Sequence, residues 1–448
     1  MSSIGFVKYI NMKTEPPGPK ARKVVEETTR LLSPSIARFY PLVIEKAHGA
    51  LVEDVDGNRY IDLNAGLGVL SVGSTPSPVV DAIKKQAEKF LHFSYTDFYY
   101  ENIIKLAEKL VEITPGSWEK SVYYGNSGAE AVEAAIKLAR YHTRRPRMLA
   151  FSGAFHGRTM GALSLTSSKT RQMKGFSPLL SGVTHVPYPY CYRCPYGKTF
   201  PDCGYFCTDF IQHEVLDKYV PAEEVAGVFF EPIQGEGGYV VPPPDFFKRL
   251  EKMMKPNGIL MVDDEVQSGI GRTGKWFAIE HWGIEPDMVL IAKGIAAGMP
   301  LSALVAKKSV MTWEPGSHAS TFGGNPLSAA SALETLKMIE QGKLMENAER
   351  LGSQLMKRLN EMKEKYEIIG DVRGKGLMVG VEIVKDKRSK EFGIKEVERI
   401  LDYSWKHGAL LLSCGKSSLR IFPPLVIEQD MLDEGLDVVE EAIKRAAS

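Results

Sequence analysis

The sequence has no excess of charge of either sign and no long apolar run. Its 448 residues include 56 basic and 55 acidic side chains, so the formal net charge is +1. A surface that binds nucleic acid is usually strongly basic, so this balance argues against such a partner. No apolar run reaches the roughly 18 residues of a membrane-spanning helix, and the first residues lack the apolar core of a signal peptide. We therefore expect a cytoplasmic protein without nucleic-acid or membrane partners.

Cysteine is also scarce, with five residues in the chain, but four of them lie close together. These are Cys191, Cys194, Cys203 and Cys207, in the segment YPYCYRCPYGKTFPDCGYFC. A structural zinc site is one interpretation of this spacing. Disulfides are a second, because cytosolic proteins of hyperthermophiles do contain them, and free thiols are a third. None of these is catalytic, and we predict no catalytic metal. The fifth, Cys414, is expected to be a buried apolar residue.

The sequence does contain enough apolar material for a large core. Hydrophobic residues make up 44% of the chain and charged residues 25%, as in globular proteins. A length of 448 residues is enough for two or three domains. The helical segments are rich in Lys and Glu, which is typical of thermophilic proteins.

Short apolar runs alternate with helical segments from residue 121 to residue 306. Several runs are uninterrupted, which is typical of strands covered on both faces, and helices between them favour a mainly parallel sheet. The predicted strands are 121–124, 148–152, 182–186, 225–230, 258–262, 288–292 and 302–306. We expect an α/β protein with a large domain over 66–330, built on a mainly parallel seven-stranded sheet. A C-terminal α+β domain, 331–448, forms the small domain, to which the N-terminal segment 1–65 contributes.

Polar side chains follow two of these runs. Asp264 comes shortly after the run 258–262, and Lys293 comes directly after the run 288–292. Open α/β sheets bind ligands beyond the carboxyl ends of their strands. A lysine among small apolar residues is poorly hydrated, which lowers its pKa and makes it a usable amine nucleophile. A lone lysine at a strand end is more often a surface residue, so this interpretation depends on the rest of the chain.

Three further segments add polar or aromatic groups to the same predicted edge. The stretch 125–131, GNSGAEA, lies between a strand and a helix, where unpaired N–H groups bind phosphate. A tight turn without a ligand is the alternative, and the stretch matches neither the NAD nor the ATP phosphate motif. Phe155 could stack on a planar cofactor or belong to the core. Glu231 follows another strand. A phosphate cradle, an aromatic ring, an acid and an amine together meet the requirements of pyridoxal 5'-phosphate (PLP).

The chain resembles the class III (subgroup II) aminotransferases of fold type I, the group that contains ornithine and 4-aminobutyrate aminotransferases. The resemblance covers nearly the whole chain. It rests on six motifs, GNSGAEA (125–131), FHGRT (155–159), EPIQGEGG (231–238), DEVQSGIGRTG (264–274), AKG (292–294) and STFGGNP (320–326). It implies the PLP-dependent transferase fold type I and a PLP cofactor.

The resemblance also implies roles for single residues. Lys293 is the expected Schiff-base lysine, and Asp264 is the expected partner of the ring nitrogen. Glu236 is similar to the family's switch carboxylate, and Arg420 to the arginine that binds the substrate carboxylate or pairs with Glu236. The other expected cofactor contacts are Ser127, Gly128, Ala129, Phe155, His156, Glu231, Gln267 and Thr321. In the family the equivalent of Thr321 reaches the neighbouring subunit, which implies a homodimer with shared active sites, or a higher oligomer.

Two reactions remain open at this stage. In both, the lysine removes the Cα proton of an amino-acid substrate. Returning a proton to the cofactor gives transamination, and returning it to Cα from the opposite face gives racemisation. The segments PPGPKARKV and TRRPRMLAF resemble those of hyperthermophilic archaeal members, several of which are racemases, one of them acting on leucine and methionine.

We therefore predict a racemase of neutral hydrophobic amino acids, with a 4-aminobutyrate or ω-amino-acid aminotransferase using 2-oxoglutarate as the alternative. Glu236 and the STFGGNP form favour that alternative. Glu236 is also the candidate for a second catalytic base.

Overall fold

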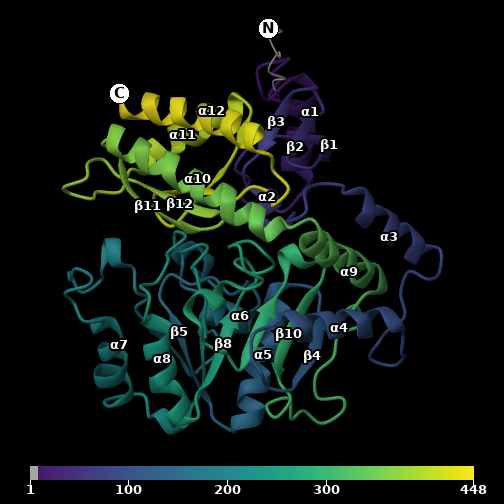
Figure 1. Ribbon diagram of the computed structural model, residues 1–448, viewed down its shortest axis with the longest axis vertical. Helices are drawn as coiled ribbons and strands as arrows, with labels where there is room; N and C mark the ends of the chain where they lie inside the picture. Colours follow the sequence, from purple (N-terminus) through teal and green to yellow (C-terminus); the bar gives the residue numbers. More distant parts are fainter. Residues whose placement is uncertain (1–8) are drawn as a thin grey trace. The chain divides into compact units, whose positions relative to one another are not determined.

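The computed structural model describes residues 9–448, which form two compact units (Figure 1). One unit joins the described residues up to Ser77 to Glu349–Ser448, and the other comprises Pro78–Ala348. Both boundaries lie further along the chain than the sequence predicted. Gly49 and Ser74 exchange two backbone hydrogen bonds, which ties residues after 65 to the first unit. Helix α9 (Pro326–Gln341) packs against α4 (Glu101–Ile113), which keeps it in the large unit.

The large unit contains a seven-stranded sheet in the order β4-β10-β9-β8-β7-β5-β6. Strand β10 is antiparallel to both of its neighbours, and the remaining pairs are parallel. The prediction of a mainly parallel seven-stranded sheet is confirmed. The strands are β4 (Lys120–Gly125), β5 (Arg147–Phe151), β6 (Val183–Val186), β7 (Val225–Phe230), β8 (Leu260–Asp264), β9 (Met288–Ile291) and β10 (Ser302–Lys307). Every residue of β7, β8 and β9 is buried, because helices and loops cover both faces.

Helix α5 (Gly128–Thr143) packs across this sheet. Its buried face is rich in alanine, including Ala131, Ala134 and Ala135, so the helix backbone approaches the strands closely. The other helices of this unit are α3 (Ser77–Ala87), α4, α6 (Met160–Leu165), α7 (Phe206–Phe210), α8 (Phe246–Met254) and α9. Short helical turns complete it, η1 (Thr170–Gln172), η2 (Cys191–Arg193), η3 (Ile211–Leu216), η4 (Ala222–Glu224), η5 (Lys255–Asn257), η6 (Ala278–Trp282) and η7 (Lys293–Ala296).

The small unit is built on two four-stranded sheets. The first has the order β1-β2-β3-β13, and the second has the order β11-β12-β15-β14. Their strands are β1 (Ile44–His48), β2 (Leu51–Asp54), β3 (Arg59–Asp62), β11 (Ile369–Lys375), β12 (Met378–Ile383), β13 (Ala409–Leu410), β14 (Leu412–Cys414) and β15 (Ser418–Ile421). The helices are α1 (Pro19–Leu31), α2 (Ala65–Gly68), α10 (Leu344–Lys365), α11 (Ile394–Lys406) and α12 (Gln429–Ala447).

Strand β13 pairs in parallel with β3, so a late segment of the chain completes the sheet that an early segment begins. Helices α11 and α12 pack against each other and both contact β13. Among residues 9–448, no helix combines the length and apolar character needed to cross a membrane.

Candidate active site

The last residue of β8 is a buried carboxylate with a buried partner. Asp264 lies inside the strand, whereas the sequence predicted that the strand ends before it. The Nδ1 atom of His156 lies 2.6 Å from the Asp264 Oδ2 atom, in hydrogen-bond contact. The backbone N–H of Val266 donates to the other carboxylate oxygen at 3.1 Å. The carboxylate is therefore fixed in orientation at the carboxyl end of the sheet.

Hydrogen bonds fix both the side chain and the backbone of His156. Its backbone N–H donates to the Thr166 hydroxyl at 2.9 Å. Burial by itself would lower the pKa of His156, but the hydrogen bond and charge of Asp264, with the charge of Glu231, outweigh burial and raise it. The two side chains therefore form a buried ion pair, in which the cation stabilises the Asp264 carboxylate.

Glu231 follows β7 and is fully enclosed. Burial raises its pKa to about 7, and the charge of Asp264 adds to this effect. One of its oxygens accepts the Phe155 N–H at 3.0 Å, and the other accepts the Gly235 N–H at 2.9 Å. Glu231 thus clamps two predicted site loops together, and it sets the position of the Phe155 backbone.

The predicted phosphate-binding residues lie at the N-terminus of α5. Ser127 is the N-cap residue, and its hydroxyl accepts the Glu130 N–H at 3.3 Å. The backbone N–H groups of the first helical turn have no partner within the helix and carry the positive end of its dipole. A Cβ on Gly128 would lie 2.9 Å from Val266 Cγ1, and a Cβ on Gly157 would lie 2.7 Å from the Cβ of Ala129. Only glycine fits at both positions, so the two loops approach the helix end closely.

Lys293 directly follows Ala292 at the end of β9 and begins the short helical turn η7. Its side chain is half-buried, and its φ of 46° lies in the left-handed region. A non-glycine residue there costs on the order of 1 to 3 kcal/mol and is held only by its surroundings. Such strain is typical of functional positions, and it fixes the direction in which the lysine leaves the strand.

Two buried polar atoms near these loops point to a ligand. In the described part of the chain, the Gln267 Oε1 and His156 Nε2 atoms are buried and have no hydrogen-bond partner. Buried polar atoms normally have partners, so both atoms are available to a bound polar group. A Cβ on Gly235 would lie 2.7 Å from Gln267 Oε1, which places that amide against the 231–238 loop. These residues fit PLP.

Glu236 pairs with a residue that sequence reasoning missed. The Lys169 Nζ atom lies 3.0 Å from the Glu236 Oε2 atom. Lys169 stands in the stretch Ser168–Thr170, which matches no motif, so no signal in the sequence could have found it. Arg420, the partner that the resemblance suggested, lies in β15 of the small unit and is 3% exposed.

Thr321 is exposed on a loop that is anchored by its neighbours. The Ser320 hydroxyl accepts from Asn126 Nδ2 at 3.1 Å and from the Gly323 N–H at 3.2 Å. A Cβ on Gly323 would lie 2.5 Å from the Tyr124 carbonyl oxygen, so this loop lies directly on the end of β4. The loop therefore adjoins the segment that carries Asn126, next to the N-terminus of α5.

Asp263 differs from its neighbour Asp264. It is fully buried, and neither of its carboxyl oxygens has a partner among the described residues. Burial raises its pKa well above the ordinary value, with the charges of Glu265 and Asp264 adding to the effect. We therefore expect Asp263 to be a neutral acid in the core, unlike Asp264 beside it in the sequence.

Comparison with known proteins agrees with this geometry. The family described as aminotransferase class-III matches residues 33–443. An alanine/serine racemase from Pyrococcus horikoshii is 42% identical, over 98% of this chain and 94% of the relative. A leucine/methionine racemase from Thermococcus litoralis is 43% identical, over 95% of this chain and 96% of the relative. A 4-aminobutyrate aminotransferase from Mycobacterium leprae is 37% identical, over 96% of this chain and 97% of the relative.

Solved structures agree in fold. An (S)-enantioselective omega-transaminase from Thermomicrobium roseum matches with a TM-score of 0.89 and 31% identity, over 96% of this chain and 99% of that chain. The match extends over both units, and the family match alone covers most of the sequence. The chain belongs to the class III aminotransferase family, with the α/β fold type I of PLP-dependent transferases and pyridoxal 5'-phosphate as its cofactor.

Proposed function

We propose that this protein is an amino-acid racemase that interconverts the L and D forms of neutral hydrophobic amino acids, of the leucine and methionine type. The observation that carries the proposal is the order of identities. Two archaeal amino-acid racemases match at 42% and 43%, whereas the 4-aminobutyrate aminotransferase matches at 37%. All three share the family chemistry, so the choice between them concerns where a proton returns.

In this proposal Lys293 is the base that removes the substrate Cα proton. When bound, PLP supplies an electron sink for the negative charge left at that carbon. Asp264 keeps a proton on the ring nitrogen, and His156 holds the Asp264 carboxylate in place through the 2.6 Å contact. The buried ion pair acts in surroundings that exclude water, where charges interact strongly.

The other residues bind and orient. The backbone at Ser127, Gly128 and Ala129 would hold the phosphate, because the helix N-terminus offers unpaired N–H groups. Phe155 would stack on the cofactor ring, and Gln267 would bond its 3-hydroxyl oxygen. Glu231 keeps the Phe155 loop closed through the 3.0 Å hydrogen bond.

Racemisation needs a proton donor on the face opposite Lys293. Glu236 is our candidate for that donor, and Arg420 is our candidate for the group that binds the substrate carboxylate. The side chain of Glu236 is 17% exposed and lies against Lys169, so it is shielded from water and has a cation beside it. The Lys169 cation favours the ionised carboxylate, so Glu236 can donate a proton only after this ion pair opens on substrate binding.

The second candidate is a 4-aminobutyrate or ω-amino-acid aminotransferase that uses 2-oxoglutarate. The observation that favours it is Glu236 itself, together with the STFGGNP loop, since both have the form found in aminotransferases of this family. In such an enzyme Glu236 pairs with the arginine that otherwise binds a carboxylate, and this lets one site accept two kinds of substrate.

The deciding experiment incubates the PLP-loaded enzyme with L-leucine, with and without 2-oxoglutarate. We expect D-leucine to accumulate in both reactions, with no 4-methyl-2-oxopentanoate. Glutamate formed without any D-leucine would refute the racemase and support the second candidate. Repeating the reaction with L-methionine and with 4-aminobutyrate then ranks the substrates.

We also propose that the active enzyme is a homodimer, or a higher oligomer of such dimers, in which Thr321 serves the partner subunit's phosphate. Mixed dimers of Lys293→Ala and Thr321→Ala chains test this directly. If the sites are shared, one site of each mixed dimer keeps both residues and activity returns on mixing. If Thr321 serves its own chain, neither site is complete and no activity returns. The cytoplasmic location stays a prediction.

A further inference from the structure

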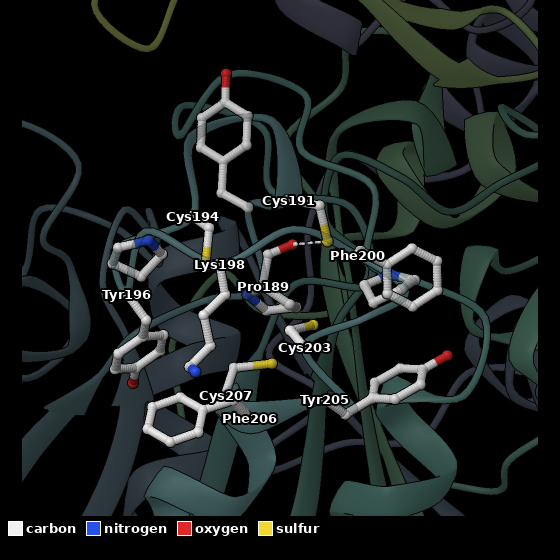
Figure 2. Close-up of a pocket in the computed structure, with 13 residues that line it drawn as sticks. Pro189, Cys191, Cys194, Tyr196, Lys198, Phe200, Cys203, Tyr205, Phe206 and Cys207 are labelled. Atoms are coloured by element: carbon white, nitrogen blue, oxygen red, sulfur yellow. Dashed lines mark hydrogen bonds between the residues drawn. The ribbon is translucent and has the colours of Figure 1, made fainter.

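Four of the five cysteines line one pocket of the large unit, and none of the residues given a role above lines it. Cys191, Cys194, Cys203 and Cys207 all belong to its lining, and Figure 2 shows the four side chains around the pocket. The pocket has a volume of about 20 Å³, which is room for a single water-sized atom. Most of the remaining lining is proline and aromatic, including Tyr196, Phe200 and Phe206.

The local backbone explains why the sulfur atoms meet. Cys191 begins the helical turn η2, and Cys194 caps it, so these two stand three residues apart on one turn. Cys203 and Cys207 stand four residues apart, and Cys207 lies in the first turn of α7. Residues three apart on a helical turn share a face, which applies to Cys191 and Cys194. Cys203 precedes α7, and the left-handed backbone of Gly204 and Tyr205 turns the chain between Cys203 and Cys207.

Tight turns allow the two pairs to face each other. The Gly197 N–H donates to the Cys194 carbonyl oxygen at 3.0 Å, with the glycine at a φ of 64°. The Phe206 N–H donates to the Cys203 carbonyl oxygen at 3.1 Å. The chain thus reverses direction between Cys194 and Cys203 and returns to the same pocket.

We propose that these four cysteines form a structural zinc site. The ligand spacing is Cys-x2-Cys followed, after eight residues, by Cys-x3-Cys, and both short spacings are typical of zinc ligands. Four sulfur atoms around a cavity of atomic size suit a soft or borderline metal ion, whereas water needs stronger hydrogen-bonding partners than thiols.

Zinc binding requires the cysteine side chains to rearrange. In residues 9–448 no three His, Cys, Asp or Glu side chains already stand in an arrangement that holds a metal. The four sulfur atoms must therefore draw together around the ion, and the free energy of metal binding can offset the cost of this ordering. Cys191 is exposed and the other three are half-buried, which leaves the ion a path into the pocket.

The negative charge of a zinc–thiolate site would lie in the same pocket as the positively charged Lys198. Zinc held by four thiolates carries a net charge of −2, because four S–H bonds break and four protons leave as four Zn–S bonds form. No electron is transferred, so the step needs no oxidant. Lys198 lines the same pocket, with its Nζ atom 4.6 Å from the centre of the Phe206 ring, and supplies positive charge beside the sulfur atoms.

A zinc ion would fasten residues 191–207, called the cysteine segment from here on, to the rest of the large unit. Tyr205 lies between Cys203 and Cys207 and already contacts α8. Its hydroxyl accepts the Asp245 N–H at 3.1 Å, and the Arg249 guanidinium lies 4.5 Å from the centre of its ring. A zinc ion would lock this short, mostly irregular segment at four points.

The test is the zinc content of the full-length enzyme, purified without chelators and measured by plasma mass spectrometry. We expect about one zinc ion per chain, and close to none in the double variant Cys194→Ser/Cys203→Ser. Cys414→Ala is the matched control, since Cys414 lies in β14 of the small unit, and it should keep its zinc.

A measurement on the unaltered protein covers the case in which the double variant does not fold. Titration with an organomercurial should release zinc in step with the loss of four thiols, and cobalt in place of zinc should give sulfur-to-cobalt charge-transfer bands. Four unmodified thiols that hold no metal after incubation with zinc would overturn the proposal. So would disulfides among the four cysteines in the unreduced protein.

Discussion

Two regions of the large unit differ in how firmly hydrogen bonds fix their reactive side chains. At the carboxyl edge of the sheet, Asp264 and Glu231 are each fixed by hydrogen bonds to backbone N–H groups or to His156. The cysteine segment lies in the stretch 187–224, which contains no strand. The Cys191 Sγ atom makes a weak contact with the Pro189 carbonyl oxygen, at 3.9 Å.

The two regions show two ways of holding reactive side chains in position. The sheet edge is organised by its own backbone, so its acids are in position before any ligand arrives. The cysteine segment has too little regular structure for this, and a crosslink must supply the order. Changes at the edge should therefore alter catalysis, whereas changes in the segment should alter stability.

The largest effect is expected for Lys293→Ala. Loss of the base should lower turnover with L-leucine by about 10³-fold or more, and the visible absorbance of the bound cofactor should change. Lys308→Ala is the control, because Lys308 is an exposed lysine of the same unit, paired with Glu119. Unchanged absorbance and turnover in Lys293→Ala would remove this residue from the site.

The adjacent acids of β8 give the next test. Asp264→Asn removes a charge that faces His156, and we expect turnover to fall on the order of 10²-fold. Asp263→Asn replaces a neutral acid with a neutral amide, so turnover should change by less than about threefold. The comparison is made by steady-state kinetics on both variants. Equal losses would show that Asp263 also acts as a charge.

Glu231 should make stability depend on pH. Its pKa is raised from 4.5 to about 7 in the folded protein, so the folded state binds the proton more tightly than the unfolded state. The stabilisation is complete below about pH 4.5 and is lost as the pH rises through about 7.

The contribution is on the order of 1 to 3 kcal/mol in the free energy of unfolding. Denaturant unfolding of the cofactor-free protein at pH 5 and pH 7.5 measures it. We expect the difference between the two pH values to shrink in Glu231→Gln. An equally steep pH dependence in that variant would assign the effect to other groups, His156 first among them.

The smallest effect on turnover is expected in the cysteine segment. Cys194→Ser/Cys203→Ser should leave turnover per PLP-loaded site within roughly twofold, because neither residue belongs to the candidate active site and the change acts on folding stability. The midpoint of thermal unfolding should fall, measured beside Cys414→Ala. A large loss of turnover with unchanged thermal stability would reverse the contrast between the two regions.

Much of the fold follows from the sequence because its strands are apolar without interruption. Strand β7 (Val225–Phe230) has the bounds that the sequence predicted, since its apolar run is uninterrupted and has clear ends. Strand β11 (Ile369–Lys375) was missed, because Asp371, Arg373 and Lys375 give it the composition of a loop.

The site was less predictable than the sheet. Asp264 and His156 lie far apart in the sequence, and only the fold brings their side chains together. Lys169 carries no motif, so its ion pair with Glu236 could not be foreseen. The opposite fates of Asp263 and Asp264 depend on which face of β8 each side chain occupies, and two consecutive acids look alike in a sequence.

The pairing of β13 with β3 has a consequence for synthesis of the chain. Ala409 pairs with Ile61, so the first sheet of the small unit cannot be completed until the ribosome has made almost the entire protein. The large unit, Pro78–Ala348, is continuous and can fold while translation goes on. During that interval β3 lacks its partner β13, so the early strands β1, β2 and β3 form a sheet with an unpaired edge. An unpaired edge is prone to aggregation, so chaperone protection matters most there.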